Sequence, residues 1–201
     1  DYVSNSDKNR YDKLKSFELT NIQFEKLKKV AKGENLLFIS TPFDIDSALF
    51  LSEIVDAIKI ASGDNTFYPL IEEVAKISKP IILSSGLADM NQIIKAKKLI
   101  YDTWKNNNIK NQLAILHCVA SYPVEPKYAN LRAINTLINN LDCDVGYSDH
   151  TLGIHAASSA VALGAKIIEK HFTVDKNFSD FRDHQLSADP SEMKKMVKVI
   201  R

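Results

Sequence analysis

From residue 19 onward, short apolar runs alternate with longer segments in which apolar residues recur at helical spacing. Helical spacing indicates amphipathic helices, and short continuous apolar runs are typical of strands buried on both faces of a parallel sheet. The predicted strands lie at residues 36–39, 57–61, 80–83, 112–116, around 145 and at 167–168. The predicted helices lie at residues 19–32, 46–54, 70–78, from 89 to the asparagine run at 106–108, at 130–141, in the alanine-rich segment before 165, and from 189 onward. Residues 1–11 are polar and predict a loop or the frayed tail of a missing element. The repeated order of strand and helix makes the chain α/β with six βα units.

Side chains that cap helices stand at several of the predicted helix starts. Thr20 and Asp89 each precede a predicted helix, and both side chains can accept a hydrogen bond from a free backbone N–H. The last helix has a stronger start, because Asp189 is a cap, Pro190 fits the first turn and Glu192 completes a capping box.

Polar and reactive residues follow every predicted strand. The strand ends read Ser-Thr, Lys with Ser-Gly-Asp, Ser-Ser-Gly, His-Cys, Ser-Asp-His and Glu-Lys-His. A barrel builds its site from the ends of many strands, whereas an open sheet concentrates it at one switch point. The pattern therefore favours a (β/α)8 TIM barrel, present here as six of its eight βα units, strands 3–8. We expect residues 1–201 to be one barrel domain whose first two units lie upstream.

The composition excludes several classes of protein. The 201 residues carry a net charge of +1, which gives no electrostatic footprint for nucleic acid. No apolar run approaches the roughly 20 residues that a membrane span needs, and the start shows no signal-peptide pattern. Cys118 and Cys143 are too few for a disulfide framework. We therefore expect a cytoplasmic protein with no nucleic-acid or membrane partner.

Two histidines follow the last two predicted strands. His150 and His171 each end an apolar run, and the carboxyl ends of neighbouring parallel strands lie close together. Two imidazoles suit a divalent metal such as Mn, Fe, Co or Zn, and the alternative is two histidines satisfied by hydrogen bonds. Asp149 and Glu169 are either residues that orient the histidines or helix-cap and salt-bridge partners.

Lys59 lies inside a predicted strand, at a position expected to face a core or the interior of the barrel. A lone buried lysine is costly, so it usually serves a phosphate, a carboxylate or a Schiff base. The alternative is an edge lysine that faces solvent. Lys170 has a weaker claim to a role in the site, because its neighbour His171 should point to the other face of the strand.

Small hydroxyl side chains gather at the strand ends beside Gly63 and Gly86. They are Thr41, Ser62, Ser84, Ser85 and Ser148. Turns of this kind expose N–H groups that hold phosphate, although serine is common at strand ends. Cys118 is either a thiol nucleophile or a small buried side chain. The charged run 181–187 is a loop that either reaches over the mouth of the barrel or stays on the surface.

Seven stretches carry a resemblance to a known family. They are STPFD at 40–44, IKIASGD at 58–64, PIILSSG at 80–86, LHCVASYP at 116–123, NLRAI at 130–134, GYSDHTLG at 146–153 and IIEKHFT at 167–173. In these stretches, and in register from about residue 11 to residue 201, the chain resembles the N-acylneuraminate (sialic acid) synthase family. GYSDHTLG followed by EKHFT is the most specific part of the match.

The resemblance implies a (β/α)8 barrel and a C–C bond-forming transferase. Such an enzyme condenses phosphoenolpyruvate with an open-chain N-acyl-hexosamine to give a nonulosonic acid and phosphate, for surface-glycan synthesis. By the same resemblance, His150 and His171 hold a divalent metal, Mn or Mg, and Lys59 is a charge clamp. The residues implied to hold phosphoenolpyruvate with Lys59 are Thr41, Ser62, Ser84 and Ser148, and those implied to face the sugar are Tyr122, Asp64 and Asp183. The full-length protein is expected to be a homodimer.

The sequence departs from the family pattern in three places. Asp64 stands where the family usually has Glu, and Val119-Ala120 replaces a Thr followed by Ser or Asn. Phe181-Arg182-Asp183 replaces a Gly-Pro-Asp turn, and Arg182 either supplies an anion contact or marks a different sugar. These changes bear on the identity of the substrate more than on the class of reaction.

Some parts of the family's active site have no counterpart in residues 1–201. The family's first two strands carry a glutamate thought to act in proton transfer or water activation, and a C-terminal antifreeze-like domain covers the partner's site in a swapped dimer. Two rival interpretations therefore stay open: a truncated, non-catalytic barrel remnant that binds ligand or partner, and a Schiff-base aldolase that uses Lys59. The edges of an incomplete sheet are also expected to drive self-association.

Overall fold

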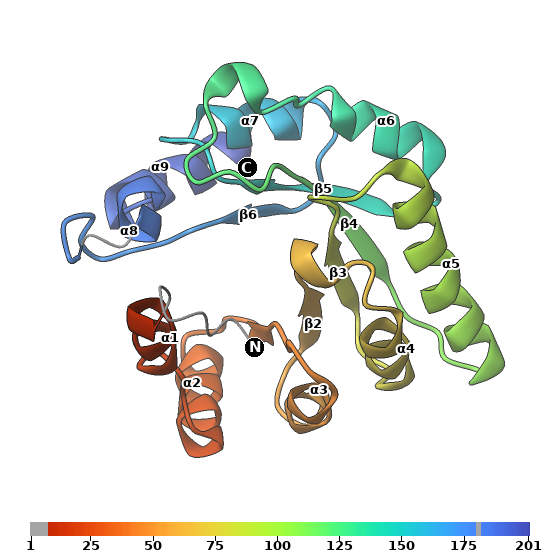
Figure 1. The fold of residues 1–201 in the computed structure, drawn as a ribbon. Coiled ribbons are helices and arrows are strands. Elements are labelled where there is room, and N and C mark those ends of the chain that lie inside the picture. Colours follow the sequence, from red (N-terminus) through yellow and green to blue (C-terminus); the bar gives the residue numbers. More distant parts are fainter. Residues whose placement is uncertain (1–7, 180–181) are drawn as a thin grey trace.

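Six parallel strands form one curled sheet in the computed structural model, which describes residues 8–179 and 182–201 without the side chains of residues 8–10, 13 and 182. The strands follow one another across the sheet in chain order. They are β1 (Ile39–Ser40), β2 (Ala57–Ile60), β3 (Ile81–Ser84), β4 (Leu113–Cys118), β5 (Asp144–Asp149) and β6 (Ile168–Lys170). The strands curl around an open interior as part of a barrel wall does (Figure 1). The predicted α/β architecture, six βα units of a barrel, is confirmed.

Helices between the strands cover the convex side of the sheet (Figure 1). The helices between strands are α3 (Ile45–Ser52), α4 (Tyr68–Lys76), α5 (Met90–Asn106), α6 (Ala133–Asn140) and α7 (His155–Ala162). Helices α1 (Lys8–Lys15) and α2 (Asn21–Gly33) precede β1, and α8 (Arg182–Leu186) and α9 (Pro190–Ile200) follow β6. Short 3-10 turns at Ser62–Asp64 and Pro126–Tyr128 follow β2 and β4. Within the described residues, no helix is long and apolar enough to cross a membrane.

The two faces of the sheet differ in chemistry because successive side chains of a strand point to opposite faces. Ile58 and Ile60 of β2 point outward and belong to the main apolar core, together with Leu83 of β3 and Tyr147 of β5. The helices supply the other half of that core, including Leu70, Val74, Ile100, Trp104 and Ile134. Lys59 lies between the two isoleucines and therefore points into the interior of the curled sheet.

All three predicted helix caps are confirmed. The side chains of Thr20, Asp89 and Asp189 each accept a hydrogen bond from the third backbone N–H of the helix that follows. The side chain at that third position accepts a hydrogen bond from the N–H of the cap in turn, in each case from Gln23, Gln92 or Glu192. These reciprocal bonds satisfy N–H groups that a helix start otherwise leaves unpaired. The starts of α2, α5 and α9 could therefore be predicted from the residue types at the caps.

The predicted strand at residues 36–39 is wrong in position. Strand β1 covers only Ile39–Ser40, and Leu36 and Leu37 are 64% and 74% exposed. The cause is the end of α2, where Asn35 takes a left-handed backbone conformation with φ of 56°. The N–H of Leu36 then bonds back to the carbonyl of Ala31, so this apolar pair closes a helix instead of entering the sheet.

Two segments predicted as loops contain helices. The prediction for residues 1–11 is wrong from residue 8, where α1 begins, and residues 1–7 lie outside the described part. The prediction for the run 181–187 is wrong for Arg182–Leu186, which form α8, and residue 181 lies outside the described part. Leu186 is the buried apolar anchor of α8, and one anchor does not create a recognisable helical period.

Expressed by itself, the 201-residue chain is expected to self-associate. Strands β1 and β6 each have one neighbour in the described sheet, and Leu36, Leu37 and Ile39 expose apolar surface beside the β1 edge. Size-exclusion chromatography with light scattering measures the association, and the double substitution Leu36→Lys/Leu37→Lys is expected to reduce it. A monodisperse monomer of the unsubstituted chain at high concentration would contradict this prediction.

Candidate active site

Lys59 and Glu169 meet across the interior of the curled sheet. Lys59 lies on β2 and Glu169 on β6, yet Lys59 Nζ is 3.4 Å from Glu169 Oε2. Ser148 of β5 donates a hydrogen bond to Glu169 Oε1 at 2.7 Å. We call Lys59, Ser148 and Glu169 the inner cluster. Lys59 is only 8% exposed, so the alternative of a solvent-facing lysine is wrong.

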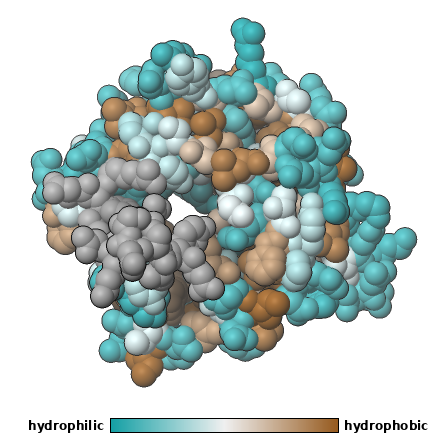
Figure 2. All heavy atoms as spheres, in the orientation of Figure 1, coloured by the Kyte–Doolittle hydropathy of each residue, from teal (hydrophilic) through white to brown (hydrophobic). Residues whose placement is uncertain are grey.

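The hollow that holds the inner cluster is open to solvent. The space-filling view, in the orientation of Figure 1, shows an opening through the molecule (Figure 2). The Glu169 side chain keeps 42% of its surface exposed, whereas that of Lys59 keeps 11%. The ammonium group is thus largely enclosed, while its carboxylate partner stays accessible to whatever enters the hollow.

His150 and His171 also point into the interior, two residues beyond Ser148 and Glu169 on their strands. Their ring centroids lie 5.3 Å apart. The ring of Tyr122, from the loop after β4, lies 4.1 Å from that of His150 and 5.7 Å from that of His171. The structure therefore brings the two histidines together at the mouth, as the strand pattern predicts, and adds Tyr122 to them.

The hydrogen bonds of His150 fix which ring nitrogen is free. His150 Nδ1 donates to the Val119 carbonyl at 2.8 Å, which leaves Nε2 available as a ligand. Cys118 Sγ lies 4.0 Å from the same Nδ1. Burial lowers the pKa of His150, but the bonds to Cys118 and to the Val119 carbonyl outweigh burial and raise the pKa overall. Cys118 is a buried side chain of the interior, beside the histidine.

His171 is electrostatically different from its neighbour. Burial and the positive charge of His150 lower the pKa of His171, against the opposing effect of the Asp183 and Glu169 carboxylates. At neutral pH, His171 is therefore the neutral imidazole that binds metals. Asp183, on α8, is close enough to His171 for its negative charge to act on the ring.

Ser84, at the end of β3, has a buried hydroxyl oxygen that finds no hydrogen-bond partner among the described residues. A buried unpaired hydroxyl is unfavourable, and a bound ligand can satisfy it. The backbone around it is held in place by Asn65, whose side-chain amide donates to the carbonyls of Ser84 and Gly86. Asn65 is 4% exposed, and nothing in its sequence context distinguishes it from other turn residues.

Ser62 lies against the ends of β3 and β4 because Gly86 has no side chain. A Cβ added at Gly86 would lie 2.7 Å from Ser62 Oγ and 3.3 Å from the Cys118 carbonyl. Burial raises the pKa of the Cys118 thiol, but the side chains of His150, Ser62 and Ser148 beside it lower that pKa overall. Two of the predicted hydroxyl residues thus converge on one point of the interior.

Thr41 and Asp64 follow β1 and β2 at the same edge of the sheet. Thr41 is half-buried directly after β1. Asp64 ends the 3-10 turn after β2, and burial raises the pKa of its carboxyl group. The side chain of Arg182, for which the sequence left two roles open, lies outside the described residues.

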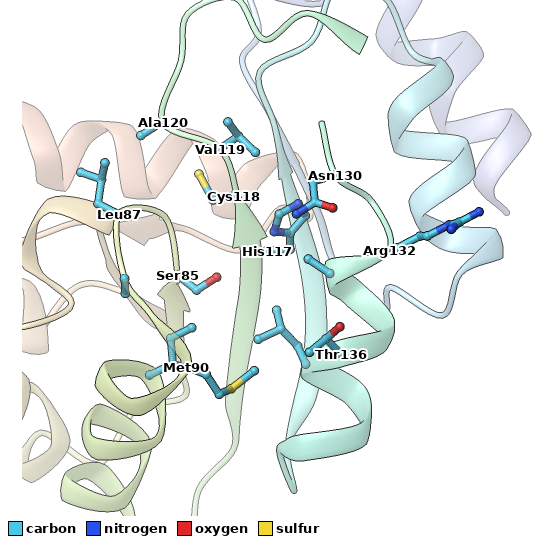
Figure 3. A pocket seen from close by; sticks show the side chains of 14 residues that line it. Ser85, Leu87, Met90, His117, Cys118, Val119, Ala120, Asn130, Arg132 and Thr136 are labelled. Atoms are coloured by element: carbon cyan, nitrogen blue, oxygen red, sulfur yellow. The ribbon is translucent and has the colours of Figure 1, made fainter. Parts of the chain in front are cut away.

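A separate hollow of about 690 Å³ lies on the helix side of β4, between α5 and α6. Figure 3 shows His117 and Asn130 on one side of it and Ser85, Leu87 and Met90 on the other. Burial lowers the pKa of His117, whose Nε2 lies 2.9 Å from the Ala129 carbonyl. Ser85, Cys118, Val119 and Ala120, which the sequence analysis singled out, line this hollow, whereas Lys59, His150 and His171 do not.

The donors at the mouth fit a divalent metal that accepts imidazole. The described residues contain no group of three or more His, Cys, Asp or Glu able to hold a metal ion. His150 and His171 could therefore supply two ligands, and water or substrate would have to supply the others. Mg²⁺ prefers oxygen ligands, so two imidazoles favour a transition metal.

Asp149 and Glu169 both form salt bridges, which was one of the alternatives that the sequence left open for them. Glu169 pairs with Lys59 inside the sheet, and Asp149 pairs with Lys170 on its outer face. Lys170 points away from the interior, as its position next to His171 predicts. The sequence predicted neither ion pair, because the two members of each pair are distant in sequence and come together only through the sheet.

A protein-family model and several known proteins match this chain. The model of the NeuB family matches residues 1–201. An uncharacterized protein of Methanocaldococcus jannaschii is 50% identical over 192 residues, which is 95% of this chain and 55% of that protein. The N,N'-diacetyllegionaminic acid synthase of Campylobacter jejuni is 40% identical over 197 residues, which is 98% of this chain and 58% of that protein.

A solved structure agrees with the sequence matches. The N-acetylneuraminic acid (sialic acid) synthetase of Leptospira borgpetersenii, in complex with citrate, superposes with a TM-score of 0.84 at 39% identity. The match covers 91% of this chain and 62% of that chain. This chain spans 55% and 58% of the length of the two curated relatives.

His171 is expected to titrate below the ordinary imidazole value of about 6.5, as measured by NMR of its ring protons. A lowered pKa means that protonation favours the unfolded state. The stability contributed by neutral His171 is therefore present above about pH 6.5 and is lost as the pH falls through the folded-state pKa.

The substitution His150→Gln tests the cause of this shift. It removes the neighbouring positive charge, so the pKa of His171 should rise while burial still holds it below the ordinary value. His155→Gln, in α7, is the matched control and should leave the pKa of His171 unchanged. An unchanged pKa in His150→Gln would contradict the coupling of the two rings.

Proposed function

The chain belongs to the NeuB family, and from that premise we propose that it contributes the barrel site of a nonulosonic acid synthase. The proposed reaction condenses phosphoenolpyruvate with an open-chain N-acyl-hexosamine to give a nonulosonic acid and phosphate. The names of the C. jejuni and L. borgpetersenii relatives support a product of the sialic or legionaminic acid type.

One observation carries the proposal: a cation, hydroxyl groups and two imidazoles converge at one mouth from different strands. Lys59 comes from β2, Ser148 from β5, and His150 and His171 follow β5 and β6. A substrate that carries phosphate and carboxylate together requires such a cation with several short donors. An aldehyde partner requires an electrophilic group beside it, and the two histidines stand where they can hold one.

The proposed phosphoenolpyruvate site lies on the β1–β5 part of the mouth. Lys59 provides the positive charge, and the Ser84 hydroxyl, buried and unpaired, provides a free donor. The other hydroxyl groups proposed to contact this substrate are those of Thr41, Ser62 and Ser148. Ser148 and Lys59 both contact Glu169, so they are already oriented toward a carboxylate partner.

The proposed sugar site lies beside the histidines. Tyr122 stacks against His150 and offers an apolar ring with a polar hydroxyl group, which suits a sugar. Asp64 and Asp183 are proposed to accept hydrogen bonds from sugar hydroxyl groups at the edges of this site. Asp183 reaches it from α8, close to His171.

His150 and His171 are proposed to hold a divalent metal, with Mn favoured over Mg because both protein ligands are imidazoles. When bound, the metal supplies Lewis acidity that polarises the sugar aldehyde. The residues of the chain prepare the ligands: the Val119 carbonyl orients the His150 ring, and the low pKa of His171 keeps that ring neutral. At neutral pH, His171 therefore keeps a lone pair, and His150 would present Nε2 to a metal once that nitrogen has lost its proton.

In the proposed reaction, the enol carbon of phosphoenolpyruvate forms a bond to the aldehyde carbon, water adds to the resulting cationic carbon, and phosphate leaves. Lys59 stabilises the negative charge of the phosphate. Lys59 Nζ lies 3.4 Å from Glu169 Oε2, so the nitrogen that a Schiff base would use is engaged in an ion pair. This contact supports a charge clamp over the aldolase interpretation.

Phosphate release from phosphoenolpyruvate tests the proposed reaction. The assay uses the protein at its natural length with Mn²⁺ and a panel of N-acyl-hexosamines. Release is expected to require both the metal and a sugar, and His150→Ala should reduce it by more than about 100-fold because a metal ligand is lost. The sugar that gives the highest rate identifies the substrate.

Three other outcomes separate the rival interpretations. Mn²⁺ or phosphoenolpyruvate binding without release from any sugar would support a non-catalytic binding module. Borohydride trapping of a carbonyl substrate on Lys59, without any need for metal, would support a Schiff-base aldolase. Release that survives in His150→Ala would contradict the proposed role of this histidine.

Lys59→Met is expected to weaken phosphoenolpyruvate binding by about 10- to 100-fold, because a charge-assisted hydrogen bond contributes about 1.5–3 kcal/mol. Isothermal titration calorimetry measures the affinity. Lys166→Met is the matched control, since the Lys166 side chain is 69% exposed and pairs with Asp144 away from the mouth. Equal affinities of the two variants would contradict a role for Lys59 in holding the substrate.

A further inference from the structure

A second ion pair lies on the outer face of β5 and β6, directly behind the two histidines. Asp149 Oδ2 and Lys170 Nζ lie 3.0 Å apart, and the two side chains are 0% and 1% exposed. Asp149 and Lys170 are also register partners in the parallel pairing of the two strands. Asp149 precedes His150 and Lys170 precedes His171, so the alternation that turns the charges outward turns the imidazoles inward.

Further hydrogen bonds tie this pair to the backbone around His150. Asp149 Oδ1 accepts from the Thr151 N–H and the Thr151 hydroxyl, both at 2.8 Å, and from the Tyr147 hydroxyl at 3.3 Å. Lys170 also donates to the Thr151 carbonyl. We call Tyr147, Asp149, Thr151 and Lys170 the outer clamp. His150 lies between two of its members, and its backbone is therefore held on both sides.

The outer clamp specifies how β6 lies on β5. A slip of one residue in the pairing would turn every side chain of β6 to the opposite face, and it would separate two buried charges. Strand β6 has only three residues and pairs with one neighbour in the described sheet, so its backbone hydrogen bonds alone constrain it weakly. The buried pair makes alternative registers of β6 unfavourable.

We propose that Asp149 and Lys170 are positioning residues that set the spacing of His150 and His171. They act through the backbone from the opposite face of the sheet and touch neither the metal nor the substrate. The outer clamp fixes the register that brings the two imidazole rings to 5.3 Å. The consequence for metal affinity rests on the proposed function, whereas the consequence for the ring geometry does not.

A double substitution with a matched control tests this proposal in the protein at its natural length. Asp149→Asn/Lys170→Met removes both charges together, so no unpaired charge is left buried, and the asparagine can still accept from Thr151. Asp144→Asn/Lys166→Met is the control. It removes an ion pair of 2.6 Å between β5 and the residues that lead into β6, whose side chains are 45% and 69% exposed.

Two measurements are made below the unfolding midpoint of each variant. The first is the dissociation constant of Mn²⁺ by electron paramagnetic resonance, and the second is the ring-to-ring nuclear Overhauser effect between His150 and His171 in the metal-free protein. The outer-clamp variant is expected to bind Mn²⁺ about 10- to 100-fold more weakly and to lose the ring-to-ring signal. The control is expected to stay within about twofold and to keep the signal.

A folded outer-clamp variant with unchanged Mn²⁺ affinity and an unchanged ring-to-ring signal would overturn the proposal. If the unsubstituted protein does not bind Mn²⁺, the proposed metal role fails, and the ring-to-ring signal alone decides the positioning role. If the double variant does not fold, Thr151→Val replaces it, because this change removes one donor to Asp149 and keeps both charges. Thr151→Val is expected to weaken the signal, and no weakening would overturn the proposal.

Discussion

The curvature of the parallel sheet is the constraint on which the candidate site depends. Successive side chains of each strand point to opposite faces, and the outward ones bury their apolar surface against the helices. The inward ones are thereby free to be polar, and the curvature brings those of distant strands together. The contact between Lys59 of β2 and Glu169 of β6 exists only because the sheet curls. In a flat sheet the two groups would be separated by the strands between them.

Local signals explain what the sequence predicts well. The caps Thr20, Asp89 and Asp189 act within a single turn, so their residue types suffice to place the starts of three helices. The six strands and their parallel order follow from apolar runs separated by helices. The predicted strand at 36–39 failed because the same apolar residues can also close a helix, and only the left-handed conformation of Asn35 decides between the two outcomes.

The candidate site was predictable in its composition and not in its contacts. Strand-end residues such as Ser62, Ser148 and His150 could be named from their positions. Their partners could not, because Glu169 reaches Lys59 through space and Asp149 reaches Lys170 across a strand pair. The buried, unpaired hydroxyl of Ser84 is also invisible in a sequence, since it depends on how closely its neighbours pack.

Because the Glu169 carboxylate is accessible, an anion that enters the hollow has to compete with it for Lys59. Glu169 is the resident counter-ion of Lys59 and also holds Ser148, so an incoming anion has to displace it from both. A ligand with one negative charge would replace one carboxylate with another and gain little. A ligand with several charged oxygens can occupy Lys59, Ser148 and further donors at once, so the exchange discriminates by charge number before any shape is recognised.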